Sequence, residues 1–158
     1  MTYYLNVFTP STYQIFSKST QDITGFQLNR ESIAKRVQIG DKLLCYVTQH
    51  SRWCGFLEVT SEYFIDESPL FVRTKDPFIV RFSVKPVIWL PLESAVSIKD
   101  EFIWNKLTFT KNVEMDSSRW TGAIRRGLNT IKDCDGQFLE SVLLNKGKKK
   151  SQKGNSTQ

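Results

Sequence analysis

Two runs of strand-forming residues, separated by a short polar connection, constrain the fold of this chain most. The first, Gly40–Thr48, begins with a Gly-Asp turn and then becomes apolar. The second, Ser51–Val59, begins with Ser-Arg-Trp and is also mainly apolar. Runs of this kind joined by so few residues predict an antiparallel hairpin. We expect its strands over residues 42–48 and 53–61.

Two further segments have strand character. Tyr3–Thr9 is rich in strand-forming residues, and residues 78–85 alternate between apolar and polar side chains. Thr9 followed by Pro10 is typical of a helix start, with Thr9 as the N-cap. Because Pro86 has no N–H to give to a ladder, the strand before it either runs at a sheet edge or bends there.

Short helices are predicted between and after these strands. Residues 29–37 and 120–131 carry apolar residues at helical spacing, and a final helix begins at Asp133 or Asp135. Residues 62–77 form a polar loop. Strands and helices do not alternate as they do in a doubly wound sheet. We therefore expect an α+β domain built on a strongly curved sheet or small barrel.

The charge of the chain is concentrated at one end. The 158 residues carry a formal net charge of +6, and five lysines lie within residues 146–158, where there is no acid. Without them, 17 basic residues face 16 acidic ones. We expect one domain over residues 1–145 and a disordered tail over residues 146–158. The tail either attracts phosphates weakly or only adds solubility.

Few residues are suited to bind a metal. The chain has three cysteines, no Cys-x-x-Cys pair and a single histidine, His50. Cys45 and Cys54 could face each other across neighbouring strands, but we expect two buried thiols. This pattern disfavours a zinc site and a disulfide framework. With no signal peptide or membrane-spanning run in the sequence, we expect a cytoplasmic protein without cofactor or membrane partner.

The start of the second hairpin strand is a candidate ligand site. Trp53 stands beside Ser51 and Arg52. An indole next to a hydroxyl and a cation is suited to hold a flat, polar ligand such as a nucleobase. The alternative is that Trp53 fills the core of the barrel.

Several segments, taken in order along the chain, resemble the EVE domain, a member of the PUA-like superfamily together with the YTH, ASCH and SRA-type readers. The resemblance covers roughly residues 2–145. It is carried by Asn6-Val7-Phe8-Thr9-Pro10, Ile39-Gly40-Asp41-Lys42-Leu43-Leu44-Cys45-Tyr46, Arg52-Trp53-Cys54-Gly55-Phe56-Leu57-Glu58-Val59-Thr60-Ser61, Asp76-Pro77-Phe78-Ile79-Val80-Arg81-Phe82, Leu107-Thr108-Phe109, Arg119-Trp120, Arg126-Gly127-Leu128 and Asp135-Gly136. It implies a PUA-like, curved, mainly antiparallel β-barrel flanked by short helices.

The resemblance also implies a pocket that holds a modified base. Trp53 is the first candidate for its stacking face, and Phe26 and Phe71 stand where we place the other walls, which are tryptophans in the YTH relatives. Candidates for contacts to the base edge are Ser51, Thr48 and Asn6; the alternatives are turn chemistry for Ser51 and strand packing for the other two. Candidates for phosphate contacts are Arg52, Lys106, Lys111, Arg119, Arg125 and Arg126.

The expected function is a non-catalytic reader of a modified base, preferably in DNA, with a restriction or modification system as its setting. An RNA reader is the alternative within the same superfamily. A module that grips methylated lysine in an aromatic pocket is a second alternative. An enzyme is a third, but the acids near Phe71, namely Glu62, Asp66 and Glu67, lack a partner set for catalysis.

Overall fold

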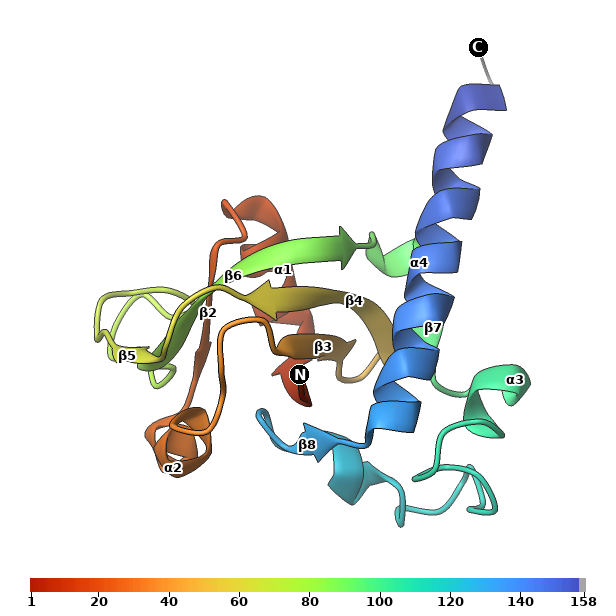
Figure 1. The fold of residues 1–158 in the computed structure, drawn as a ribbon, viewed down its shortest axis with the longest axis horizontal. Coiled ribbons are helices and arrows are strands. Elements are labelled where there is room, and N and C mark those ends of the chain that lie inside the picture. Colours follow the sequence, from red (N-terminus) through yellow and green to blue (C-terminus); the bar gives the residue numbers. More distant parts are fainter. Residues whose placement is uncertain (157–158) are drawn as a thin grey trace.

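A mixed sheet curved into a half-barrel organises the chain (Figure 1). The computed structural model describes the backbone of residues 1–156 and the side chains of residues 1–149. The main path of the sheet runs β2-β6-β4-β3-β1-β8, with β5 added to β6 and β7 added to β4. The strands are β1 (Tyr3–Phe8), β2 (Ile23–Phe26), β3 (Lys42–Val47), β4 (Arg52–Val59), β5 (Phe64–Ile65), β6 (Val80–Trp89), β7 (Val96–Ser97) and β8 (Thr130–Ile131).

Short helices flank this sheet, and one long helix ends the chain. The α-helices are α1 (Pro10–Lys18), α2 (Glu31–Ala34), α3 (Glu101–Trp104) and α4 (Asp133–Ser156). Three 3-10 segments are η1 (Leu28–Arg30), η2 (Leu92–Ser94) and η3 (Thr121–Ile124). The first part of α4 lies along the sheet, and its last turns extend beyond the body (Figure 1). None of the helices in the described residues combines the length and apolar composition needed to cross a bilayer.

The expected α+β architecture on a curved sheet is confirmed, with one parallel pair in an otherwise antiparallel sheet. β3 and β4 form the predicted hairpin, whereas β1 runs parallel to β3. The chain reaches β3 from β1 through α1, β2 and α2, and a crossover of this kind is what parallel neighbours require. Thr9 caps α1 as predicted, because its Oγ1 accepts from the Thr12 N–H at 3.1 Å.

Pro86 lies at a register shift, on a part of β6 that is paired on one side only. β6 lies between β2 and β4, and Pro86 faces Leu57 next to a register shift in the β4–β6 ladder. Nearby, a Cβ added to Gly55 would lie 2.2 Å from the Ile88 carbonyl oxygen, so the two strands approach too closely for a side chain. The irregularity accommodates the proline within a paired strand and increases the local twist.

Residues 120–131 do not form the predicted helix. η3 ends at Ile124, the chain then turns, and Leu128 has a φ of +63° before β8 begins at Thr130. A left-handed residue cannot continue a right-handed helix, so the apolar spacing of this segment serves packing against the sheet. The final helix does begin at Asp133. It continues through part of the segment for which we predicted disorder, and residues 157–158 lie outside the described residues.

Two hydrophobic cores lie on the two faces of the sheet. The first contains Phe8, Phe26, Phe71 and Phe82 and fills the concave side with α1. The second contains Trp53 and is covered by α3, η3 and α4. The predicted base-pocket aromatics are therefore divided between two cores.

Candidate functional site

The half-barrel has an open seam between β1 and β2. β2 is paired only with β6, and β1 is paired with β3 and, at its start, with β8. Asn6 bridges the seam, because its Nδ2 donates to Thr24 Oγ1 at 2.8 Å. Asn6 is 2% exposed, so this bond links the two strands from within the core.

A cavity of about 410 Å³ lies at this seam, and we call it the seam cavity. Its walls come from the end of β1, the end of β2, η1, the segment before β6 and the turn after η3. The residues around it are Val7, Thr9, Gly25, Phe26, Gln27, Asn29, Arg30, Phe78, Arg125, Arg126 and Gly127. It thus gathers the predicted wall Phe26 and two of the predicted phosphate contacts, Arg125 and Arg126.

One side of the seam cavity is aromatic. Phe26 packs edge-on against Phe82, with ring centroids 6.1 Å apart. A Cβ added to Gly127 would lie 2.8 Å from the Phe26 ring, so this turn can approach the ring only because residue 127 is glycine. Phe78 is half-buried and is held by Phe71, whose ring centroid lies 5.5 Å away. Phe71 therefore supports a wall from behind.

The other side of the seam cavity is cationic. Arg30 donates from Nε to the Gly127 carbonyl at 2.9 Å and from Nη2 to Asn129 Oδ1 at 2.9 Å, which ties the turn to η1. Burial lowers the pKa of Arg30, and the positive charge of Arg126 lowers it further. Among the described residues, three guanidinium groups and no carboxylate line the cavity. Converging cations of this kind favour an anionic ligand.

A buried carboxylate orders the loop that carries Phe71 and Phe78. Asp76 accepts backbone N–H bonds at 2.6–3.1 Å from Leu70, Phe71, Val72 and Phe78. Burial raises the pKa of Asp76, but these four donors outweigh it, and the pKa lies below its usual range. The guanidinium of buried Arg81 lies 3.8 Å from this carboxylate. Its Nε donates to the Phe78 carbonyl at 3.0 Å, and two further bonds reach Ser68.

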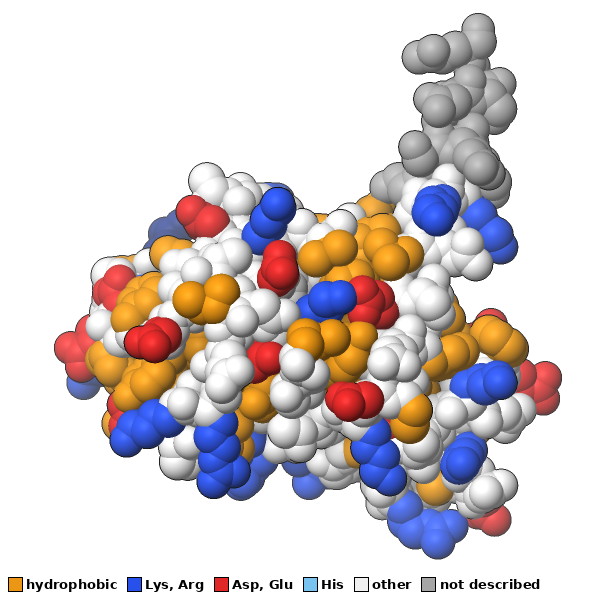
Figure 2. Space-filling view, viewed as in Figure 1, with side chains coloured by type: hydrophobic (Ala, Val, Ile, Leu, Met, Phe, Trp, Pro, Cys, Tyr) orange, Lys and Arg blue, Asp and Glu red, His pale blue; other side chains and the backbone are white. Residues whose placement is uncertain are grey.

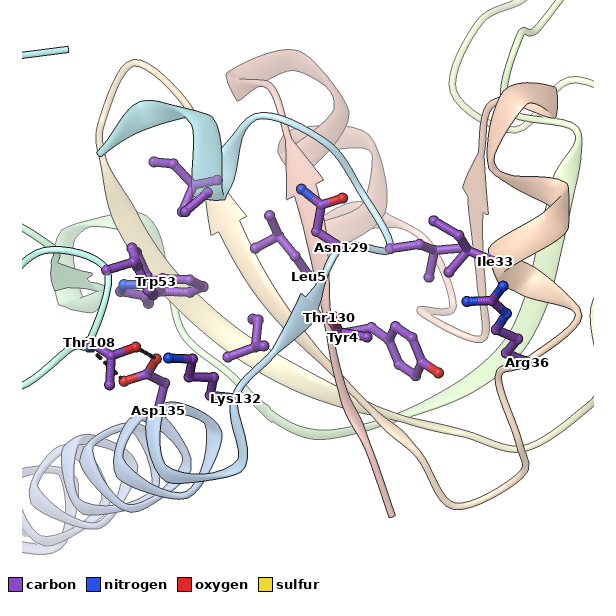
Figure 3. Close-up of a pocket in the computed structure, with 15 residues that line it drawn as sticks. Tyr4, Leu5, Ile33, Arg36, Trp53, Thr108, Asn129, Thr130, Lys132 and Asp135 are labelled. Carbon is purple, nitrogen blue, oxygen red and sulfur yellow. Dashed lines mark hydrogen bonds between the residues drawn. The ribbon is translucent and has the colours of Figure 1, made fainter. Parts of the chain in front are cut away.

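Trp53 lies beside a different cavity, of about 390 Å³, which Figure 3 shows and which we call the arch cavity. The segment from η3 to β8 arches over Leu5; Trp53, Thr108 and Asp135 lie at one end, and Tyr4, Ile33 and Arg36 at the other. The Asp135 carboxylate accepts from the Thr108 N–H at 2.8 Å and from the Thr108 hydroxyl. Its charge is thus compensated within the fold.

The Trp53 side chain has no exposed surface. It is 0% exposed, and its ring packs edge-on against Tyr46 with centroids 5.0 Å apart. Its Nε1–H is buried and has no hydrogen-bond partner within the described residues. Any ligand in the arch cavity would have to displace other side chains before it could stack on the indole. In this structure Trp53 fills the second core, which was the alternative interpretation of the sequence.

The other predicted contacts to the base edge lie apart from the seam cavity. Ser51 has a φ of +54° in the turn between β3 and β4. The Thr48 N–H donates to the Phe8 carbonyl at 2.9 Å. Arg52, predicted to contact phosphate, instead donates from Nη1 to the Leu92 carbonyl at 2.8 Å, which anchors η2. These three residues serve local structure around the hairpin.

Exposed cations extend from the seam along one edge of the molecule. Figure 2 shows Lys and Arg side chains gathered along the edge that runs from α2 to the segment between α3 and β8. The exposed cations of that segment include the remaining predicted phosphate contacts, namely Lys106, Lys111 and Arg119. Residues 105–132 contain six basic residues and two acidic ones, so the near-neutral body is locally basic here.

Two important residues of the seam cavity, Arg30 and Phe78, had no assigned role in the sequence. The sequence does contain a signal for this site: a glycine stands next to two of the predicted site residues, Gly25 before Phe26 and Gly127 after Arg126. A Cβ on Gly25 would lie 2.6 Å from the Phe78 carbonyl oxygen, so each glycine permits a close approach at the cavity.

Within the part of the chain that the structure describes, no group of three or more His, Cys, Asp or Glu residues could hold a metal ion.

Comparisons with known proteins agree with this fold. No protein-family model matches the chain. A UPF0310 protein of Pyrococcus abyssi is 26% identical over 155 residues, which cover 90% of this chain and 100% of that protein. The crystal structure of the Mmi1 YTH domain superposes with a TM-score of 0.66 at 12% identity, covering 94% of this chain and 99% of that one.

A second YTH domain is similar over most of the chain. The YTH domain of Zygosaccharomyces rouxii MRB1, solved in complex with N6-methyladenosine RNA, gives a TM-score of 0.57 at 15% identity. The match covers 89% of this chain and 86% of that one. The chain therefore has a PUA-like fold of the kind found in YTH domains.

Proposed function

We propose that this protein is a non-catalytic nucleic-acid-binding module of the EVE type, and that it holds a modified base in the seam cavity. One observation carries the proposal: Phe26 and Phe78 share a cavity with three arginines and with no carboxylate. A base offers a π-face to the phenyl rings, and the phosphates on either side offer charge to the guanidinium groups.

The stacking and charge contacts of the site can offset the cost of taking a base out of its stack. Unstacking costs a few kcal/mol, and stacking on an aromatic side chain returns about 1–3 kcal/mol per base. The phosphate contacts of Arg30, Arg125 and Arg126 supply additional attraction, which depends on salt. The exposed cations Lys106, Lys111 and Arg119 extend the path for a strand beyond the cavity.

The nature of the strand is the least constrained part of the proposal. The resemblance to EVE domains implies modified DNA, whereas the similar structure from Zygosaccharomyces rouxii holds N6-methyladenosine RNA. Both are therefore tested. A methylated lysine is a poorer ligand for this cavity, because three guanidinium groups would repel its charge.

A binding comparison with matched oligonucleotides tests the proposal. Single-stranded DNA and RNA of one sequence are prepared with and without N6-methyladenine, and a second set carries 5-methylcytosine. We expect at least one modified strand to bind about tenfold more tightly than its unmodified match at 150 mM salt. Equal, weak binding to all strands that disappears with modest salt would contradict the proposal and leave only non-specific attraction.

A further inference from the structure

β1 has one residue whose backbone groups face the seam without a partner. The Lys42 N–H donates to the Thr2 carbonyl at 3.0 Å, and the Thr48 N–H donates to the Phe8 carbonyl at 2.9 Å. Even-numbered residues of β1 therefore turn their N–H and C=O toward β3. The odd-numbered residues, including Val7, turn theirs to the opposite edge.

Most of that opposite edge is covered. Leu5 donates to the Asn129 carbonyl at 2.9 Å and accepts from the Leu128 N–H at 2.6 Å. Within the described residues, no segment outside the strands bonds to the N–H or C=O of Val7, two residues further on, and no ladder joins β1 to β2. α1 then begins at Pro10. The unpaired edge is thus one residue long, and it opens into the seam cavity.

β2 faces Val7 with a matching edge. The Val84 N–H donates to the Asp22 carbonyl at 2.9 Å. Because bonded and non-bonded pairs alternate along an antiparallel ladder, Thr24 and Phe26 are the residues bonded to β6. Gly25 therefore turns its N–H and C=O away from β6, and it too lines the seam cavity.

We propose that the peptide groups of Val7 and Gly25 form the hydrogen bonds that recognise the edge of the bound base; this rests on the reader function proposed above. Backbone polar groups in folded proteins are nearly always paired, and these are left for solvent or a ligand. Every base carries a hydrogen-bond donor and an acceptor side by side on one edge. The ligand class is a base whose modification leaves at least one donor and one acceptor on that edge.

The length of the free edge decides against a peptide ligand. An added peptide strand draws its affinity from a series of main-chain bonds along a sheet edge. Here the segment 127–129 occupies the edge before Val7, and α1 occupies the position after it. A planar ring that forms one or two bonds fits this opening, with Phe26 and Phe78 beside it.

Amide exchange of the wild-type protein tests the inference directly. Exchange of the Val7 and Gly25 amides is measured by NMR with and without a saturating amount of the oligonucleotide that binds best in the comparison above. We expect exchange at one or both amides to slow at least tenfold. The Leu5 amide, already bonded to Asn129, serves as the internal reference and changes little. Unchanged exchange at Val7 and Gly25 under saturation would overturn the inference while the reader function stands.

Changes on either side of the contact provide a second test. Replacing N6-methyladenine by N6,N6-dimethyladenine, or 5-methylcytosine by 3-methylcytosine, removes a donor or acceptor from the edge, and we expect roughly tenfold weaker binding. Val7→Pro removes the free N–H without touching the β1–β3 ladder, and it should weaken binding more than Val7→Ala does. Equal binding of both members of each ligand pair would overturn the inference, as would slowing of Val7 exchange by an unstructured peptide alone.

Discussion

The seam cavity and the arch cavity have nearly the same volume, about 410 and 390 Å³, but differ in what their polar groups do. In the arch cavity the one acid, Asp135, is bonded to Thr108, and the largest aromatic residue, Trp53, is covered. Within the described residues, the cations of the seam cavity face no carboxylate, and the backbone of Val7 lies at an edge of β1 that no ladder covers. The difference teaches that cations gathered without a carboxylate, more than the size of an aromatic residue, mark the better candidate for an anionic ligand.

Trp53→Ala is expected to have the largest effect, and the effect is on stability. Truncation of a fully buried tryptophan typically costs about 3–5 kcal/mol, because it removes contacts and leaves a cavity. Unfolding in urea measures the change. Trp53→Phe, which also removes the unpartnered Nε1–H, should cost much less. Unchanged stability combined with lost oligonucleotide binding would place the ligand at the arch cavity.

Asp76→Asn should lower the free energy of unfolding by about 2–3 kcal/mol, because charge-assisted bonds to four N–H groups are weakened beside buried Arg81. Asp66→Asn is the matched control. Asp66 lies 3.4 Å from Arg81, but its side chain is 41% exposed, so we expect a loss of about 1 kcal/mol or less. Equal losses for the two variants would contradict the role given to Asp76.

The same pair predicts a pH dependence. The folded protein holds the pKa of Asp76 below its usual value, so this contribution is fully present above the unfolded pKa, about 3.9. It is lost as pH falls through the lower pKa of the folded state. Urea unfolding of wild type and Asp76→Asn should therefore converge as pH drops below about 4. A difference that stays constant from pH 7 to pH 3 would refute this assignment.

Phe26→Leu should weaken binding of the modified strand by about tenfold, because leucine fills the core but offers no π-face. Phe16→Leu is the control: Phe16 is 1% exposed in the same core and does not line the seam cavity. It should lower stability and leave the affinity of the folded protein unchanged. Equal affinity losses in both variants would mean that packing, and not stacking, sets the affinity.

The smallest changes in affinity are expected for Arg125→Gln and Arg126→Gln. Both arginines are exposed and line the seam cavity. Each should weaken all strands alike and reduce the slope of log affinity against log salt by about 0.7 for a single strand. Lys85→Gln, an exposed cation on β6, should leave the slope unchanged. Equal slopes in all variants would remove the phosphate role from these arginines.

Local signals in the sequence predicted the fold well. The β3–β4 hairpin and the Thr9 cap depend on neighbouring residues, and both are present. The prediction of a helix over residues 120–131 was wrong because the conformation of this segment depends on distant contacts. Arg30, almost one hundred residues earlier in the chain, bonds to Gly127 and Asn129. Sequence spacing cannot supply such a contact.

The site was predicted only in part, for a similar reason. Phe26, Arg125 and Arg126 do share one cavity, whereas Trp53 is covered because it packs in the second core, under α3, η3 and α4. The unpaired edge of Val7 follows from where the segment 127–129 stops along β1, which no local pattern encodes. The expected cytoplasmic location and the restriction or modification setting stay predictions.

A single NMR titration compares the two cavities most directly. The modified oligonucleotide that binds best is added to the ¹⁵N-labelled protein, and backbone amides are followed together with the Trp53 indole N–H. The account predicts that the amides of Gly25, Phe26 and Gly127 shift with a saturable profile while the Trp53 indole signal stays in place. A large, saturable shift of the Trp53 indole, with the seam amides unmoved, would contradict it.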